Sequence, residues 1–129
     1  MNSKLKILVV DDDEETLFAL GSYFNKKGFD IVTASNGLEA LKIIENTNGQ
    51  FDILITDIVM PTVTGVAIIS VVKNKYPEIP VIAITGYGQH PEALAGEANA
   101  DLVIKKPFEL SKLEESVIIL LSKASKNGT

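Results

Sequence analysis

Residues 6–15 read KILVVDDDEE, a short apolar run that passes directly into five consecutive acidic residues. Aliphatic and β-branched residues in so short a run are typical of a strand that is buried on both faces. Four further runs of this kind follow along the chain, at Asp30–Ala34, Asp52–Thr56, Pro80–Ile84 and Leu102–Ile104. Five strands that alternate with longer amphipathic segments predict an α/β fold, in which helices cover both faces of a doubly wound parallel sheet.

The segments between these strands predict five helices. The first has apolar residues at helical spacing and ends near Gly28, and the second begins at a capping box formed by Asn36 and Glu39. We expect a third helix over Gly65–Tyr76 and a fourth over Pro91–Ala98. The last helix has one apolar face, made of Leu110, Leu113, Val117, Leu120 and Leu121.

The composition limits the class of protein. A chain of 129 residues, of which 46% are hydrophobic and 22% charged, predicts one globular domain, which we place at residues 1–124 with a flexible tail at 125–129. There is no cysteine, no signal-peptide pattern and no apolar run near the roughly 20 residues of a membrane span, so we expect a cytoplasmic protein. All 12 basic residues are lysines and the net charge is −5, which argues against direct nucleic-acid binding.

Polar residues follow four of the five predicted strands. Sites in doubly wound sheets form at the carboxyl ends of the strands, so these side chains are expected to converge above one edge of the sheet. They are, in chain order, Asp11, Asp12, Asp57, Thr85, Lys105 and Lys106.

Three carboxylates in one small space repel one another unless a cation lies among them. Mg²⁺ takes oxygen ligands, and a lysine and a threonine hydroxyl at the same edge can hold the oxygens of a phosphate. Each residue taken singly has a plainer role, as a helix cap or a turn residue, and we expect Asp13, Glu14 and Glu15 only to cap the first helix. The joint placement of the others predicts a Mg²⁺-dependent site for phosphoryl transfer.

Four motifs extend the case, namely KILVVDDDEE (6–15), DILITDIVMPTVTG (52–65), VIAITGYG (81–88) and KKPF (105–108). In order and separation they resemble the motifs of the receiver domains of two-component response regulators, over essentially the whole chain. The separations are 45 residues from Asp12 to Asp57, 28 from there to Thr85 and 21 more to Lys106. The resemblance implies a flavodoxin-like fold with a five-stranded sheet in the order 2-1-3-4-5 and five helices.

The resemblance also implies roles for the site residues. Asp57 is similar to the phospho-acceptor of the family, and Asp11, Asp12, Asp57 and the backbone carbonyl of Val59 are similar to its Mg²⁺ ligands. Lys106 resembles the lysine that pairs with the bound phosphate. The implied function is that of a regulatory phosphoacceptor domain, which is not an enzyme except in its own phosphorylation and dephosphorylation.

The family further implies partners and a switch. A sensor histidine kinase or a histidine phosphotransfer protein would donate the phosphoryl group, and a downstream target protein, an attached output domain or a phosphorylation-dependent dimer would respond. Thr85 resembles the hydroxyl that moves toward the phosphate, but Val103 stands where many members carry an aromatic residue, so aromatic rotation cannot be the switch. Val59 and Tyr87 are less polar than water-positioning residues, which predicts slow loss of phosphate.

Other functions fit the residues less well. A haloacid dehalogenase-like phosphatase would need Asp-x-Asp-x-Thr or Val after the first strand, where this chain ends the motif with Glu15, and a flavin phosphate would be repelled by five acids. His90 is expected to be an exposed loop residue. Within the receiver interpretation, the alternative to a free-standing regulator is an isolated receiver module of a hybrid histidine kinase or a transcription factor.

Overall fold

The computed structural model describes residues 4–86 and 99–127. Its strands are β1 (Lys6–Val10), β2 (Asp30–Ala34), β3 (Ile53–Asp57), β4 (Val81–Thr85) and β5 (Leu102–Lys105). Its helices are α1 (Glu14–Lys26), α2 (Gly37–Asn46), α3 (Gly65–Lys75) and α5 (Leu110–Asn127). The described part of the chain thus has four helices rather than the predicted five, because the expected helix at Pro91–Ala98 lies outside the described residues, as do Tyr87 and His90.

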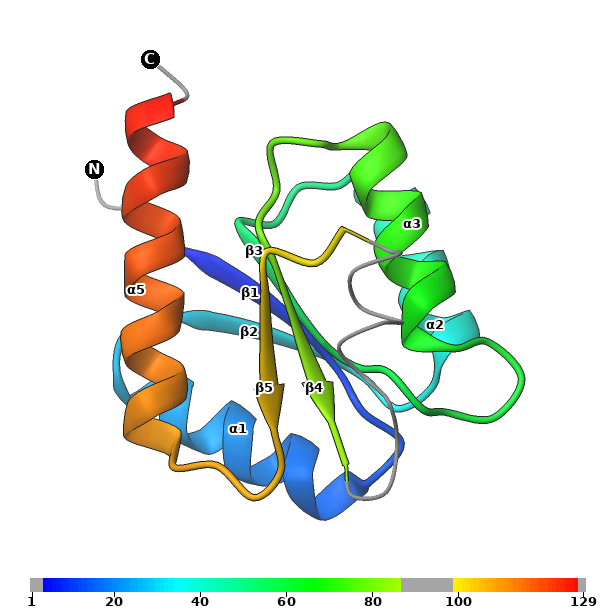
Figure 1. Cartoon of the computed structure of the whole chain (residues 1–129), viewed down its shortest axis with the longest axis horizontal. Coiled ribbons are helices and arrows are strands. Elements are labelled where there is room, and N and C mark those ends of the chain that lie inside the picture. The colour runs from blue at the N-terminus through cyan, green and yellow to red at the C-terminus, as the bar shows by residue number, and fades with distance from the viewer. Residues whose placement is uncertain (1–3, 87–98, 128–129) are drawn as a thin grey trace.

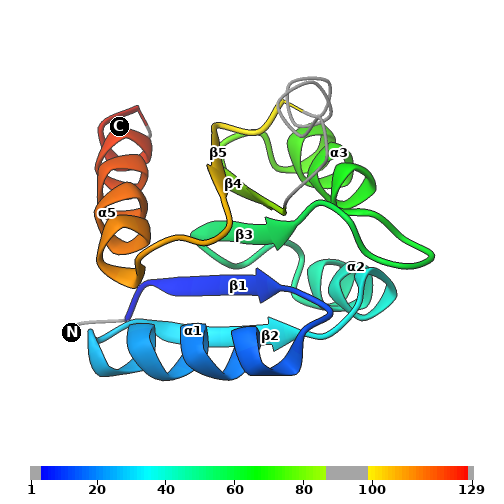
Figure 2. The same ribbon diagram turned by 60° about the horizontal axis from the view of Figure 1, so that its bottom comes forward.

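All five strands are parallel and lie in the predicted order, β2-β1-β3-β4-β5. The arrowheads of β1, β2 and β3 point toward one edge of the sheet in Figure 2, and those of β4 and β5 run together in Figure 1. Strands β3 and β4 begin and end one residue later than predicted, so Asp57 and Thr85 are the last residues of their strands. The carboxyl ends of the strands therefore meet at one edge, as the predicted site requires.

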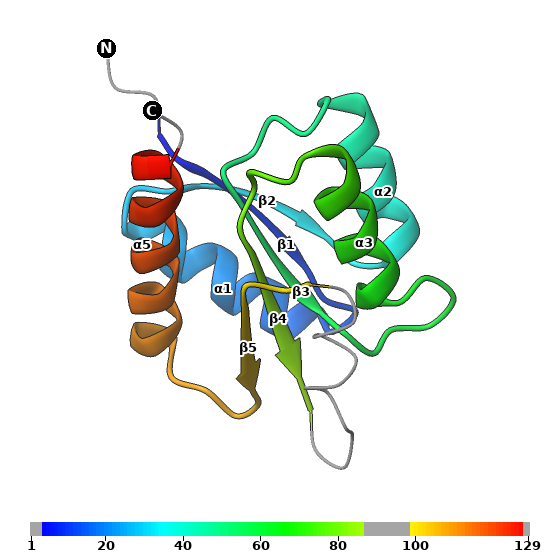
Figure 3. The ribbon, with the colours of Figure 1, turned by 45° about the horizontal axis from the view of Figure 1, so that its top comes forward.

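Helices α1 and α5 cover one face of the sheet, and α2 and α3 cover the other (Figure 3). Alternate residues of β1 enter the two cores: Ile7 and Val9 pack with α1 and α5, whereas Leu8 and Val10 pack with α2 and α3. Both sets are fully buried. Burial on both faces explains why the strand is apolar throughout instead of alternating with polar residues.

The helix ends follow the predicted signals. Asp13 caps α1 by accepting from the N–H of Glu15, and Gly28 follows that helix with φ of 95°, a conformation that glycine adopts without strain. Asn36 accepts from the N–H of Glu39 at 2.8 Å, as the predicted capping box requires. The Glu39 carboxylate accepts in return from the N–H of Ser35, one residue before the cap, instead of from that of Asn36.

The last helix continues beyond the predicted end of the domain. Helix α5 reaches Asn127, so residues 125–127 of the predicted tail are helical, while the domain boundary at residue 124 stays a prediction. Within residues 4–86 and 99–127, none of the helices has both the length and the apolar character needed to cross a membrane.

Candidate functional site

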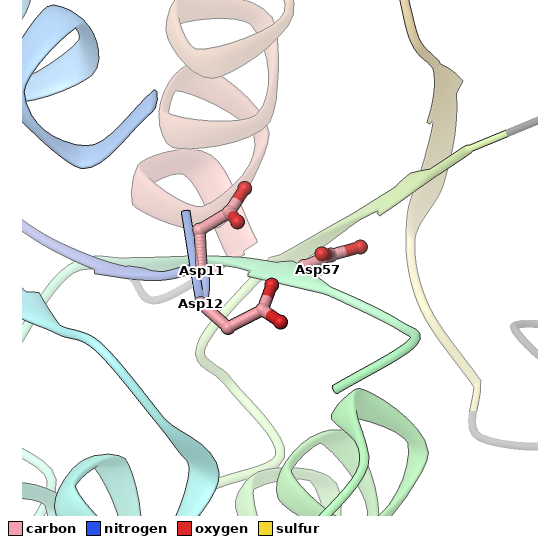
Figure 4. A group of neighbouring side chains, drawn as sticks. All are labelled: Asp11, Asp12 and Asp57. Carbon is pink, nitrogen blue, oxygen red and sulfur yellow. The ribbon is translucent and has the colours of Figure 1, made fainter. Parts of the chain in front are cut away.

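Three carboxylates lie together where β1 and β3 end. Asp11 and Asp12 follow β1 directly, Asp57 is the last residue of β3, and the two strands are paired side by side. Each carboxylate offers one oxygen, and these oxygens all lie within 4.8 Å of one another (Figure 4). Asp11 is 1% exposed and Asp57 is 7% exposed, whereas Asp12 faces solvent. The structure thus brings the three predicted carboxylates into one cluster that is open to solvent on one side.

Lys106 reaches this cluster from the end of β5. Its Nζ lies 3.2 Å from Oδ2 of Asp11 and 3.8 Å from Oδ2 of Asp57. The backbone N–H of Lys106 donates to the carbonyl of Thr85 at 2.7 Å, which ties the lysine to the end of β4. One ammonium group therefore faces two of the three carboxylates and offsets part of their negative charge.

Burial and mutual repulsion make the negative charges of this cluster unfavourable. Burial raises the pKa of the Asp57 carboxyl from 3.8 to about 6; the negative charges of Asp11 and Asp12 act in the same direction, and Lys106 and the N–H of Ile58 oppose them. Burial also disfavours the charge on Lys106, but attraction to Asp11 and Asp57 outweighs it and raises the pKa of the ammonium. An added cation would relieve the repulsion among the carboxylates.

The unfavourable charge on Asp57 should make the wild-type protein less stable than Asp57→Asn. Asparagine resembles the protonated carboxyl, so Asp57→Asn removes a group whose folded-state pKa lies above its unfolded value. Such a carboxyl destabilises the fold increasingly as pH rises through its folded pKa, and the penalty is absent below the unfolded pKa. A shift of this size, discounted for solvent screening, predicts that metal-free Asp57→Asn is more stable than wild type by about 1–2 kcal/mol at pH 8.

Urea unfolding in a chelating buffer measures this difference. The gain should be nearly lost at pH 4, where the Asp57 carboxyl of the folded protein is protonated and uncharged like the asparagine that replaces it. It should also shrink when Mg²⁺ is added to the wild type at pH 8. Equal stability of the two proteins at both pH values would contradict the strained cluster.

Asp11 joins the cluster to the first helix. Its Oδ1 accepts from the N–H of Asp13 at 2.9 Å, and its Oδ2 accepts from Lys106. Asp13 in turn accepts from the hydroxyl of Thr16 at 2.7 Å, as expected of a residue that only caps α1. The orientation of Asp11 is thereby fixed from two sides, whereas Asp12 remains available from solvent.

Thr85 is at the site but its hydroxyl is directed elsewhere. The residue is 0% exposed, and Oγ1 donates to the carbonyl of Ile104 in β5 at 3.4 Å, a long and therefore weak hydrogen bond. Val103 pairs with Ala83 and packs against the core on the α2 and α3 side. Because Ala83 and Thr85 lie two residues apart on one strand, Thr85 and Val103 share a face of the sheet.

Two residues that sequence reasoning missed shape the backbone at Asp57. The hydroxyl of Thr56 donates to the Asp57 carbonyl at 2.9 Å, and Gly65 passes so close that a Cβ there would overlap the same oxygen. Both residues belong to the motif over 52–65, but their contacts depend on how α3 docks and cannot be read from spacing. Val59 has a side chain that is 46% exposed, and its carbonyl as a metal ligand stays a prediction.

The donor set fits a hard cation. The cluster of three carboxylates offers oxygen ligands alone, which suits Mg²⁺ and gives no advantage to metals that prefer nitrogen or sulfur. A solvent-facing side suits an ion that keeps several of its waters.

Sequence comparison with known proteins indicates one family. Residues 7–118 match the family described as response regulator receiver domain. The transcriptional regulatory protein PrrA of Mycobacterium tuberculosis is 33% identical over 125 residues, which cover 96% of this chain and 53% of PrrA. The chain thus spans about half the length of the curated relatives it matches.

Solved structures agree with the fold. A CheY-like receiver domain protein of Methanospirillum hungatei superposes with a TM-score of 0.90 at 28% identity, covering 97% of this chain and 99% of that one. The response regulator TrrA of Thermotoga maritima, solved in complex with Mg²⁺ and BeF, has a TM-score of 0.79 at 34% identity, covering 90% of this chain and 98% of that one.

Proposed function

This chain belongs to the response-regulator receiver family, and we propose that it accepts a phosphoryl group on Asp57 in a Mg²⁺-dependent reaction. The observation that carries the proposal is the placement of the buried Asp57 carboxylate beside those of Asp11 and Asp12 and 3.8 Å from the ammonium of Lys106. The test is whether a small phosphodonor with Mg²⁺ labels Asp57 and no other residue.

The residues of the chain divide the work of transfer. An oxygen of the Asp57 carboxylate forms the bond to phosphorus, while the bond between phosphorus and the donor breaks, giving an aspartyl phosphate. Lys106 neutralises charge on the transferred group, and Asp11, Asp12 and Asp57 would hold the metal. When bound there, a Mg²⁺ ion would supply further positive charge to offset that of the carboxylates and of the transferred group.

Membership of the family supports a proposal for the phosphodonor and for the response. We expect a phosphohistidine on a sensor histidine kinase or phosphotransfer protein to be the donor, and TrrA, whose solved complex holds Mg²⁺ and BeF, supports the metal. The output, whether a target protein, an attached domain or a dimer, is proposed only as a changed protein interface. A receiver module of a longer protein is the second candidate, because the curated relatives are about twice as long.

A switch at Thr85 is compatible with the absence of an aromatic at position 103. The weak bond from Thr85 to Ile104 can be exchanged for a stronger one to a phosphate oxygen, since hydrogen bonds to charged groups contribute more. Val103 shares the face of Thr85 and packs into the core beside it, so a shift of Thr85 would be felt there by packing.

Metal binding should depend on the solvent-facing carboxylate. Asp12→Ala removes one of three oxygen donors, so we expect Mg²⁺ affinity measured by calorimetry to fall about tenfold or more. Glu14→Gln is the matched control, because it removes an exposed acid of the same run that is outside the cluster, and it should leave the affinity unchanged. Equal Mg²⁺ affinity of Asp12→Ala and wild type would show that the ion binds elsewhere.

Phosphorylation and switching should separate in Thr85→Ala. This variant keeps the carboxylates and Lys106, so it should still accept a phosphoryl group. On addition of beryllofluoride with Mg²⁺, however, the amide chemical shifts of Val103 and of α5 should move much less than in wild type, because the hydroxyl that links phosphate to β5 is gone. A full wild-type shift pattern in the variant would remove Thr85 from the switch.

A further inference from the structure

The backbone that carries Asp57 is held at three successive groups. The Asp57 carbonyl accepts from the hydroxyl of Thr56 at 2.9 Å, the N–H of Ile58 donates to Ile84 at 3.0 Å, and the carbonyl of Ile58 accepts from the N–H of Gly65 at 2.8 Å. Two of these bonds join backbone to backbone. The first is made by a side chain, and it therefore depends on the identity of residue 56.

Thr56 is well placed to act on the acceptor without touching the reacting atoms. Its side chain is 0% exposed, and alternation along β3 sends it to the face of Leu54, which packs with α2 and α3, whereas Asp57 takes the opposite direction. Within the described residues, the Thr56 hydroxyl makes one hydrogen bond, to the Asp57 carbonyl. The Thr56 hydroxyl therefore contacts the backbone of Asp57 and not its carboxylate.

The peptide plane that follows Asp57 has little freedom. On one side the Thr56 hydroxyl holds the carbonyl oxygen, and on the other Gly65 lies so close that there is no room for a Cβ. If these contacts were lost, the backbone at Asp57 could shift, and a shift that reorients its Cα–Cβ bond would carry the carboxylate away from Lys106 and the other two acids. Reactions in an enforced geometry are sensitive to such displacements, since a misplacement of about 1 Å can cost about 100-fold in rate.

We propose that Thr56 is a positioning residue for phosphoryl transfer: its hydroxyl fixes the Asp57 carbonyl and thereby aims the acceptor carboxylate. The inference rests on the proposed function of Asp57. A purely structural role would differ in its effect, because a buried hydroxyl that merely satisfies a carbonyl contributes to the free energy of unfolding and not to the reaction rate of the folded protein.

The test measures the rate of phosphorylation of variants that keep or remove the Thr56 hydroxyl. The full chain is used with acetyl phosphate and saturating Mg²⁺, well below the melting temperature. Thr56→Val preserves the shape and removes the hydroxyl, so the maximal phosphorylation rate should fall about tenfold while the apparent KM for acetyl phosphate changes less than about twofold. Thr56→Ser keeps the hydroxyl and should retain most of the rate. Thr47→Val is the matched control, because the Thr47 hydroxyl donates to the Ile43 carbonyl at 2.7 Å at the end of α2.

Thr47→Val should lose stability but keep the wild-type rate of phosphorylation. If Thr56→Val does not fold, Thr56→Ala against Thr56→Ser repeats the comparison, since these two variants leave similar space and differ in the hydroxyl. A wild-type rate in the variant that lacks the hydroxyl, or an equal loss in Thr56→Ser, would overturn the positioning role. Wild-type protein that takes no phosphoryl group on Asp57 would overturn the proposed function and this inference with it.

Discussion

Acetyl phosphate and Mg²⁺ are expected to add one phosphoryl group to the wild-type chain and none to Asp57→Asn. The amide keeps the shape of the carboxylate, so the fold and the neighbouring acids remain, but its oxygen is a far poorer nucleophile toward phosphorus. Loss of labelling should therefore be complete rather than partial. Intact mass spectrometry gives the stoichiometry, and peptide mapping after borohydride reduction locates the acyl phosphate.

The control for this experiment is Asp30→Asn, which changes an exposed carboxylate at the opposite end of the sheet, where β2 begins. It should be labelled like wild type. Normal stoichiometry in Asp57→Asn would move the acceptor to another carboxylate, and Asp11 and Asp12 would be the first to test because their oxygens share the cluster. Labelling that persists without Mg²⁺ would argue against a role for the metal in phosphoryl transfer.

The strands and helix ends could be predicted because their signals are local. A run such as Ile7–Val10 has to be buried on both faces, and residues such as Asn36 and Gly28 have backbone preferences that mark where a helix begins or ends. The order of the strands came from resemblance to the family and agrees with the structure. Strand ends were misplaced by one residue at β3, β4 and β5, where a polar side chain, namely Asp57, Thr85 or Lys105, continues the ladder.

The composition of the site could be predicted, but its contacts could not. The rule that strand ends converge was enough to group the three carboxylates with the two lysines, Lys105 and Lys106. Only the resemblance to the family singled out Lys106, whose ammonium lies 3.2 Å from Asp11 and 3.8 Å from Asp57 in the structure. The direction of the Thr85 hydroxyl toward β5 depends on a rotamer that sequence does not encode.

The close approach of α3 to the end of β3 was equally invisible in the sequence. It depends on how α3 docks against the end of β3. The contact is made by a glycine and by backbone atoms, and neither produces a recognisable pattern of side chains in the sequence. Gly65 was recognised only as the start of a helix. The structure requires a glycine there because the backbone of Asp57 and Ile58 leaves no room for a Cβ.

Gly65→Ala should therefore be among the most damaging single changes in the chain. A Cβ at this position would overlap the carbonyl oxygen of Asp57 and come within 2.8 Å of Cα of Ile58, and both are backbone atoms that cannot turn aside. Overpacking of a rigid site costs about 1–3 kcal/mol or more, and we expect the upper end of that range, about 3 kcal/mol. The molecules that do fold should also be phosphorylated more slowly, because relief of the overlap displaces the acceptor.

Urea unfolding of Gly65→Ala should be compared with Gly21→Ala, which adds the same methyl group in the middle of α1. The nearest atom to that added Cβ is Cγ2 of Ile31 at 3.9 Å, an ordinary contact, and alanine favours a helix over glycine by about 1 kcal/mol. The control should therefore be as stable as wild type or more so, while Gly65→Ala unfolds at a clearly lower urea concentration. If the two alanine variants had the same midpoint, α3 would not approach the end of β3 as closely as the structure has it, and the confinement of the Asp57 carbonyl between Thr56 and Gly65 would fail as well.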